Sequence, residues 1–149
     1  MEDVVIRAGT ADDITRLVGI ENAAFTGDRI NARSFRRQMR SPTLALLVAQ
    51  LRAVVHGYAL LAFRRTAKHA RLYSLAVDIE EGRGLGRRLM AAGEALAAER
   101  GYGAMRLEVN AQNARAIGIY ERAGYERIGR RENYYEDGST ALLYEKRLG

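Results

Sequence analysis

Three glycines alternate with other residues in the middle of the chain, where Gly82, Gly84 and Gly86 surround Arg83 and Leu85, and Arg87 follows directly. A glycine-rich turn that leads into a helix presents unsatisfied backbone N–H groups and the positive end of the helix dipole, which together bind phosphate. The spacing fits neither G-x-x-x-x-G-K-[ST] nor G-x-G-x-x-G. The sequence therefore predicts an anion site of another type, and a flexible surface turn is the alternative.

Glu108 and Tyr120 are the residues best suited to move protons. The run 104–110 alternates apolar and polar residues, and Glu108 falls on its polar side. A carboxylate there can act as a general base, and an ion pair with one of the many arginines is the alternative. Tyr120 follows on a short predicted helix, where its phenol can act as a proton donor. A half-buried core tyrosine is the alternative for Tyr120.

Hydrophobic periodicity predicts the elements that carry these residues. Strands are expected at 4–7, 43–50, 54–65, 70–77, 104–110, 125–135 and 140–146, and helices at 11–24, 33–40, 85–100 and 113–123. Strands joined by tight turns must be antiparallel, whereas strand–helix–strand units are parallel. The order β-α-α-β-β-β-α-β-α-β-β therefore predicts an α/β (α+β) fold: a mixed, mostly antiparallel, twisted sheet of six to seven strands with about four helices.

Length and composition limit the classes of protein. A chain of 149 residues predicts one domain over 1–149. The absence of cysteine excludes a disulfide scaffold, a thiolate zinc site and a cysteine nucleophile. No apolar stretch is long enough to span a membrane, and residues 1–3 do not resemble the start of a signal peptide. We therefore expect a cytoplasmic protein without membrane contact, and no metal at its site.

The positive charge has two possible meanings. The 24 basic residues outnumber the 18 acidic ones, which gives a formal charge of +6, and all of them except Lys68 and Lys146 are arginine. Arginine binds phosphates and carboxylates through two hydrogen bonds at once, so this composition favours an anionic partner such as a nucleic acid or a phosphorylated cofactor. A compositional bias of the genome explains the same excess, and charge alone does not decide between them.

Motifs around the glycine loop follow one another in order: Leu75-Ala-Val-Asp78, the loop, Leu107-Glu-Val109, Asn113…Ala116…Tyr120…Ala123-Gly-Tyr125, and Arg130-Arg-Glu-Asn-Tyr-Tyr135. In this combination the chain resembles the GNAT superfamily of acetyl-CoA-dependent N-acetyltransferases, and within it most closely the ribosomal-protein-alanine (RimI-type) branch. The resemblance covers about half of the chain, from about residue 72 to residue 146. It implies acetyl-CoA as cosubstrate, CoA as product, and direct acetyl transfer to an amine without a covalent acyl-enzyme.

The resemblance also implies roles for individual residues. The general base would be Glu108, and the general acid would be Tyr120. Backbone groups of one strand would bind the pantetheine arm, the loop amides would bind the pyrophosphate, and an asparagine would contact the pantetheine. The cofactor residues implied in this way are Leu75, Ala76, Val77, Gly82, Arg83, Gly84, Leu85, Gly86, Arg87 and Asn113. The chain departs from the family pattern at Ile79, where proline is usual, and at Glu81, where Gln or Arg is usual.

The acceptor amine is less well defined by the sequence. The resemblance assigns acceptor contacts to the segment with Phe25 and Asp28, and Tyr134 and Tyr135 are further candidates beside the acidic pair Glu136-Asp137. Hairpin packing is the alternative for the two tyrosines. A protein or peptide amine (an N-terminal α-amine or a lysine) is the leading acceptor, and a small amine such as a polyamine, amino acid or antibiotic is the second. A basic nucleic-acid-binding or CoA-binding module without catalysis is the third interpretation, and nucleic acid is not favoured because no recognised motif accompanies the arginines.

Overall fold

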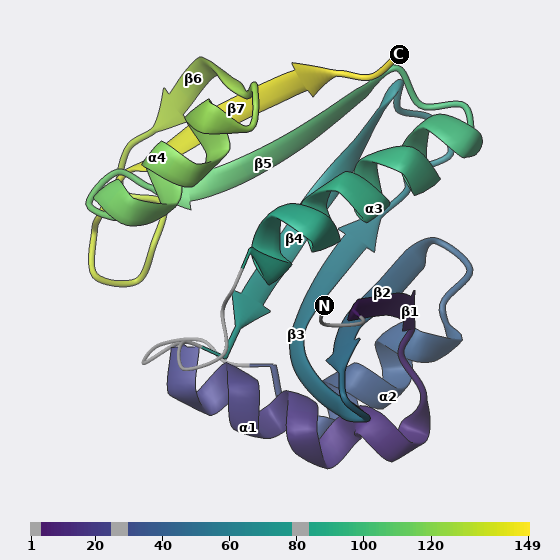
Figure 1. The fold of residues 1–149 in the computed structure, drawn as a ribbon. Coiled ribbons are helices and arrows are strands. Elements are labelled where there is room, and N and C mark those ends of the chain that lie inside the picture. The colour runs from purple at the N-terminus through teal and green to yellow at the C-terminus, as the bar shows by residue number, and fades with distance from the viewer. Residues whose placement is uncertain (1–3, 25–29, 79–83) are drawn as a thin grey trace.

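A single mixed sheet forms the centre of the fold in the computed structural model, which describes residues 4–24, 30–78 and 84–149. Within these ranges the sheet has seven strands in the order β1-β2-β3-β4-β5-β7-β6 (Figure 1). The strands are β1 (Val4–Ala8), β2 (Leu44–Leu51), β3 (Val54–Ala62), β4 (His69–Val77), β5 (Ala104–Asn110), β6 (Glu126–Arg131) and β7 (Ala141–Arg147). The helices are α1 (Ile14–Ala24), α2 (Ala32–Arg40), α3 (Leu85–Glu99) and α4 (Ala114–Arg122), with a short 3-10 turn, η1 (Ala11–Asp13), before α1. The predicted fold class and element order are confirmed.

Neighbouring strands are antiparallel throughout the sheet except for β4 and β5, which are parallel because α3 connects them. The second strand–helix–strand unit, β5–α4–β6, also runs in one direction, but its two strands are not neighbours. The last strand, β7, inserts between them and pairs with both. Hydrophobic periodicity predicts the order of strands along the chain, in which β7 comes after both β5 and β6. It therefore could not predict that β7 lies between them in the sheet.

The parallel pair is short. β5 pairs with β4 only from His69–Leu72 against Ala104–Leu107, and the two strands then diverge (Figure 1). A bulge at Tyr73 shifts the register of β4 against β3, because Leu61 pairs with Leu72 while Leu60 pairs with Ser74. Bulges bend and twist a strand. We call the point where β4 and β5 separate, just beyond Leu72 and Leu107, the apex.

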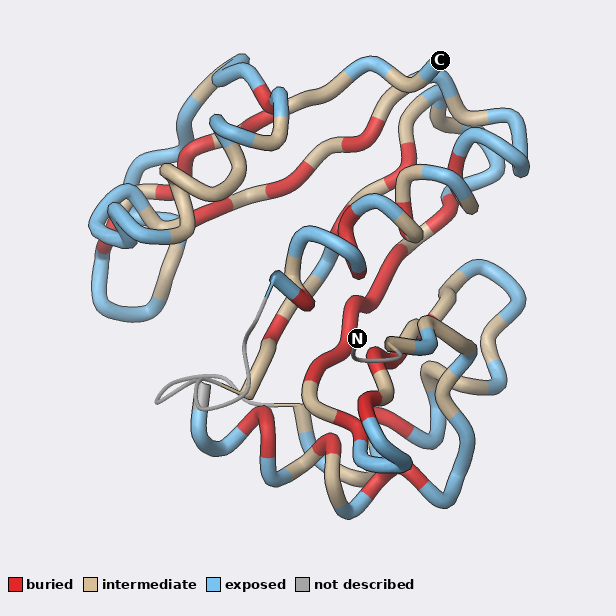
Figure 2. The backbone as a smooth tube through the Cα atoms, in the orientation of Figure 1, coloured by how far each residue is buried: buried red, intermediate tan, exposed pale blue. Residues whose placement is uncertain are grey.

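The two faces of the sheet carry separate cores. On β2, Leu46 and Val48 point to the face covered by α1 and α2, whereas Leu47 and Ala49 point to the face covered by α3 and α4, as expected for the two-residue period of a strand. The most deeply buried backbone follows β3 in the middle of the sheet (Figure 2). Helix α4 has no fully buried residue and packs on the core only through its half-buried side (Figure 2).

A chain of buried polar groups links α1 to β4. The carboxylate of Glu21, which is 2% exposed, accepts hydrogen bonds from the Tyr58 hydroxyl and from the Ile30 backbone N–H, the latter at 2.7 Å. The Tyr58 hydroxyl also lies 2.9 Å from Ser74 Oγ on β4. Burial, followed by the bond to Glu21, raises the pKa of Tyr58, so its phenol stays protonated and remains a donor. This network fixes β4 from the α1 side close to the apex.

Three predicted boundaries were wrong for local reasons. The helix expected from residue 11 begins as the 3-10 turn, where Asp13 accepts hydrogen bonds from the Thr10 backbone N–H at 2.8 Å and from Arg7. The strand expected to reach residue 65 ends at Ala62, because a turn follows. The strand expected to reach residue 135 ends at Arg131, so the tyrosine pair lies in a loop. No helix in the described ranges is both long and apolar enough to cross a membrane.

Helix α3 approaches β3 closely at Gly93. A Cβ added there would lie 2.8 Å from Leu61 Cδ2, and Leu61 is fully buried. Gly19 in α1 has no neighbour within 4 Å of the same added atom. The small residue at position 93 therefore sets the distance between α3 and the sheet.

This difference predicts opposite effects of the same substitution. Gly19→Ala should stabilise the protein by about 0.5–1 kcal/mol, because alanine favours a helix over glycine. Gly93→Ala should destabilise it by about 1–3 kcal/mol, because the gain in helix propensity is smaller than the cost of overpacking. Chemical denaturation of both variants measures this, and equal stabilisation by the two would contradict the packing argument.

Candidate active site

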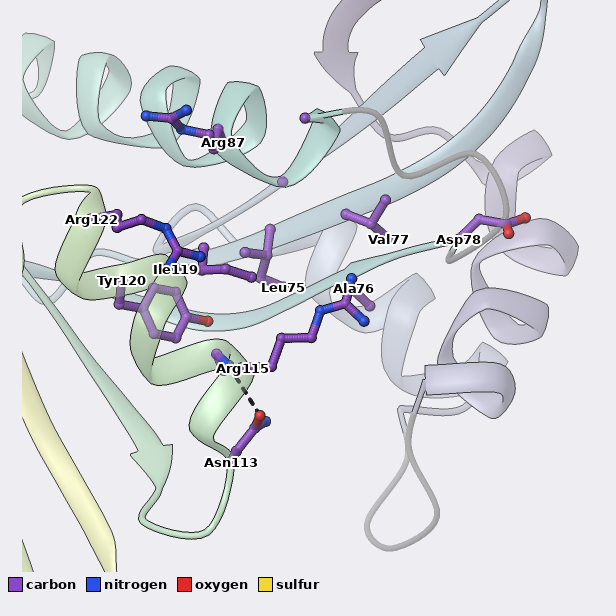
Figure 3. A pocket seen from close by; sticks show the side chains of 13 residues that line it. Leu75, Ala76, Val77, Asp78, Arg87, Asn113, Arg115, Ile119, Tyr120 and Arg122 are labelled. Atoms are coloured by element: carbon purple, nitrogen blue, oxygen red, sulfur yellow. Dashed lines mark hydrogen bonds between the residues drawn. The ribbon is translucent and has the colours of Figure 1, made fainter.

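A cavity of about 400 Å³ lies between the free end of β4, the start of α3 and one side of α4 (Figure 3). Its lining residues are Leu75, Ala76, Val77, Asp78, Gly84, Gly86, Arg87, Asn113, Arg115, Ala116, Ile119, Tyr120 and Arg122. The divergence of β4 from β5 creates this space, because a paired β5 would fill it.

The end of β4 offers unpaired backbone to the cavity. Beyond Leu72 this strand pairs with β3 but not with β5, so backbone N–H and C=O groups on its β5 side have no strand partner within the described residues. Such groups must be satisfied by water or by a ligand. Leu75, Ala76 and Val77, which the sequence assigned to the cofactor, all line the cavity.

Helix α1 holds the end of β4 in place. Arg16 donates a hydrogen bond from Nη2 to Asp78 at 2.6 Å and from Nε to the Val55 carbonyl at 2.7 Å. The Asp78 N–H donates to the His56 carbonyl at 2.6 Å. The sequence identified Asp78 only as part of a motif, and the structure shows that its carboxylate is an anchor for the strand end.

Helix α3 begins at the cavity with a left-handed residue. Gly84 caps it with a φ of 76°, a conformation that glycine adopts without strain. Gly84, Gly86 and Arg87, which the resemblance implies as cofactor residues, line the cavity. The Leu85 side chain does not reach it, because this residue is 1% exposed and packs in the core, so only its backbone can serve a ligand. The predictions for Gly82 and Arg83 fall outside the described residues.

Three arginines line the cavity without a carboxylate partner. Arg87 comes from α3, and Arg115 and Arg122 come from α4 (Figure 3). None of the three forms an ion pair with any residue in the described ranges. The Arg122 guanidinium lies back along α4, where a Cβ added at Gly118 would be 3.1 Å from Nη1. Such cations bind phosphate groups with two hydrogen bonds each.

Sequence reasoning missed two of these arginines, although a signal was present. Arg115, Ile119 and Arg122 are spaced four and three residues apart, so they share one side of a helix. Asn113, which the resemblance implies as a pantetheine contact, lines the cavity and caps α4, since its Oδ1 accepts the Ala116 N–H at 3.1 Å. The side-chain NH2 of Asn113 remains as a donor for a ligand.

Tyr120 points from α4 into the cavity toward β4 (Figure 3). Its ring packs against Tyr125 with the centroids 6.1 Å apart, so Tyr120 also has the packing role of a half-buried core tyrosine. Burial, followed by the influence of Tyr135, raises the pKa of Tyr120 to about 12. The phenol is therefore fully protonated at neutral pH and can act as a proton donor.

Glu108 stands at the apex, one residue beyond Leu107, which is the last residue of β5 that pairs with β4. It faces away from the core that Leu107 and Val109 join, and its Oε1 forms an ion pair with Nη2 of Arg71 on β4. Its Oε2 is buried and has no hydrogen-bond partner among the described residues. The ion pair that the sequence left open as the alternative role of Glu108 is therefore present. One oxygen of the same carboxylate still has no hydrogen-bond partner among the described residues. Arg71 itself carried no motif that sequence reasoning could detect.

Tyr134 and Tyr135 lie in the turn between β6 and β7. Their backbone N–H groups donate to the Ser139 carbonyl at 3.1 and 3.3 Å, and their rings meet edge to face at 5.1 Å. Burial, followed by the negative charge of Glu108, raises the pKa of Tyr135. Tyr135 therefore shares an electrostatic environment with both Glu108 and Tyr120. Phe25 and Asp28 fall outside the described residues.

Comparison with known proteins identifies the family. Residues 10–148 match the acetyltransferase (GNAT) domain. The chain belongs to the GNAT acetyltransferase family. It is 33% identical over 153 residues to the N-alpha-acetyltransferase RimI of Mycobacterium tuberculosis, covering 99% of this chain and 95% of that protein. It is 35% identical over 150 residues to the uncharacterised protein ML0378 of Mycobacterium leprae, covering 97% of this chain and only 41% of that longer relative.

A solved GNAT structure shows the same architecture. The ribosomal-protein-S18-alanine N-acetyltransferase of Escherichia coli superposes with a TM-score of 0.85 at 25% identity, covering 99% of this chain and 95% of that chain. As a GNAT acetyltransferase, this protein is an acyltransferase, and its cosubstrate is acetyl-CoA. The residues present fit that group, because the cavity combines unpaired strand backbone, a helix N-terminus and three arginines for a molecule with several phosphates.

The unpaired arginines predict a specific effect on cosubstrate affinity. The double substitution of Arg115 and Arg122 to Gln should weaken acetyl-CoA binding by roughly ten-fold or more, because each hydrogen bond to a charged group contributes about 1.5–3 kcal/mol. The salt dependence of binding should also become shallower. Isothermal titration calorimetry measures both, with Arg37→Gln on the exposed side of α2 as the matched control. Unchanged affinity in the double variant would contradict this assignment.

Proposed function

We propose that this enzyme transfers the acetyl group of acetyl-CoA to an amine of a protein or peptide, with the N-terminal α-amine preferred over lysine, and that the chain acts as one catalytic domain. The observation that carries the proposal is the buried, unsatisfied carboxylate oxygen of Glu108 at the apex where β4 and β5 separate, together with the Tyr120 phenol in the cavity that this separation opens. The amine attacks the thioester directly, so a C–N bond forms, the C–S bond breaks, and two protons must move.

Glu108 is proposed as the general base. An N-terminal α-amine has a pKa near about 8, whereas a lysine side chain is near about 10.4, so the α-amine loses its proton more readily at neutral pH. Oε2 of Glu108 takes that proton, directly or through one water. Because the carboxylate is only 11% exposed, bulk water competes little for this oxygen.

Tyr120 is proposed as the general acid, and donates its phenolic proton to the departing thiolate. The backbone of Leu75, Ala76 and Val77 would hold the pantetheine arm like an additional strand, while Gly84, Gly86 and Arg87 would hold the phosphates. These contacts align the thioester with the amine, and positioning of this kind contributes much of the rate. Tyr134 and Tyr135 would line the acceptor side.

The named activities of the relatives support a protein acceptor. The relative from Mycobacterium tuberculosis is named as an N-alpha-acetyltransferase, and the Escherichia coli enzyme as acting on the alanine of ribosomal protein S18. The open side of the apex also supports it. Among the described residues, no helix covers β5 and β7 on the sheet face that bears Glu108, so an extended N-terminus can reach the site (Figure 1).

Removal of the Tyr120 hydroxyl should affect turnover and not binding. Tyr120→Phe should lower kcat by about 10²-fold or more, because the thiolate loses its proton donor, while the Kd for acetyl-CoA changes little. Since the pKa of Tyr120 is raised to about 12, ionisation of this phenol should cause no loss of wild-type kcat up to about pH 10.

Steady-state kinetics and a pH–rate profile test this prediction. Tyr102→Phe is the matched control, because that hydroxyl only donates to the Arg64 carbonyl on the surface. Equal kcat in Tyr120→Phe and wild type would refute the acid role.

The acceptor class is tested by direct competition. Peptides with a free N-terminus, the same peptides with a blocked N-terminus and an internal lysine, free amino acids and spermidine should be offered to the wild-type enzyme and to Glu108→Gln. We expect the free N-terminus to be acetylated with the highest kcat/KM, and Glu108→Gln to lose most of this activity while Glu145→Gln retains it. Mass spectrometry locates the acetyl group. Turnover of the small amines alone would refute the protein acceptor.

A further inference from the structure

Arg71 shares the apex with Glu108. It lies on β4 directly before Leu72, and its guanidinium pairs with Glu108 from the side opposite to the cavity-forming helices. The Arg71 side chain is 37% exposed, whereas that of Glu108 is 11% exposed. The arginine is therefore the member of the pair that an arriving acceptor meets first.

A second contact orients Arg71 outward. Its Cζ lies 5.5 Å from the ring centroid of Tyr73, the bulge residue of β4. The Tyr73 ring is 60% exposed, so this cation–π contact holds the guanidinium at the surface of the open sheet face. Tyr73 lies on the same face as Arg71, because residues two apart in a strand point to the same side.

The charges around the apex are balanced. Arg71 compensates Glu108, and the neighbouring Arg106 donates to Glu145 at 2.7 Å. In the adjoining turn, the Asp137 carboxylate is occupied by the Ser139 N–H at 2.9 Å and by the Ser139 hydroxyl. Both bonds end on Oδ1 of Asp137, so this oxygen has two local donors. Among the described residues of the apex, the carboxylates of Glu108 and Glu145 are thus each matched by an arginine.

We infer that Arg71 is a specificity-determining residue, which selects acceptors with a carboxylate close to the reacting amine and disfavours those with a second positive charge there. This inference rests on the proposed function, because it concerns residues that follow an acceptor amine. The guanidinium N–H groups of Arg71 that do not bond to Glu108 would hold the acceptor carboxylate, while Glu108 keeps one oxygen for the amine. A cation at the same position would instead meet the positive charge of Arg71.

The expected size of the effect is about ten-fold in kcat/KM, which corresponds to about 1.4 kcal/mol. Charges a few ångströms apart near a protein surface interact at this level. Because Arg71 is partly exposed, added salt should reduce the discrimination.

Three peptides test the inference: identical sequences that begin with Ala-Glu, Ala-Gln or Ala-Lys. For the wild-type enzyme we expect kcat/KM to fall in that order, with about ten-fold or more between the Glu and Lys peptides. Arg71→Met should reduce this ratio to about one. Arg71→Lys should keep most of the ratio, because it retains the charge. Arg106→Met is the matched control on the same sheet face and should leave the ratio unchanged.

The ratio of kcat/KM between the Glu and Lys peptides distinguishes a loss of specificity from a displaced Glu108. If Arg71→Met merely displaced Glu108, kcat would fall equally for all three peptides and the ratio would persist, which would overturn the inference. Equal kcat/KM for the three peptides in the wild-type enzyme would also overturn it, while leaving the proposed function intact. Acetylation of none of the peptides would overturn the proposed function and this inference together.

Discussion

The separation of β4 from β5 is the constraint on which the rest of the site depends. Parallel pairing stops at Leu72 and Leu107, and the backbone groups that later residues of the two strands direct into the gap must be satisfied in another way. On β4 this leaves an edge inside the molecule, lined by α3 and α4, that can bind an extended ligand as a further strand would. The cavity is therefore a consequence of incomplete pairing and not of a missing side chain.

Several interactions keep this opening from closing. The bulge at Tyr73 bends β4, the bonds of Arg16 and Asp78 anchor its end, and the buried Glu21–Tyr58–Ser74 contacts hold it to the α1 side. The other strand is held by β7, which pairs with the whole of β5 from Ala104 to Asn110. Each strand is thus fully supported on its outer side, so the gap between them can persist without a ligand.

The arginines on the two faces of the sheet differ in whether carboxylates neutralise them. On the helix side of the sheet, the arginines of α3 and α4 face the cavity without carboxylate partners in the described ranges, which suits a polyanionic cosubstrate. On the opposite side, Arg71 is paired with Glu108 and Arg106 with Glu145. These pairs neutralise the positive charge locally, which suits an amine acceptor that must lose a proton before it attacks. An overall charge of +6 hides this difference, because the sum does not record which cations are neutralised locally.

The sequence by itself determined the element order, the strand carrying Glu108, the helix carrying Tyr120, and the glycine start of α3. These follow from short-range periodicity and capping, which a single chain displays directly. Only the tertiary structure decided that β7 inserts beside β5, that Leu85 turns into the core, and that Arg71 meets Glu108. It also brought Arg115 and Arg122 to the same cavity as Arg87. These features depend on contacts between residues far apart in the chain, and local patterns do not encode which distant strand or charge will be the neighbour.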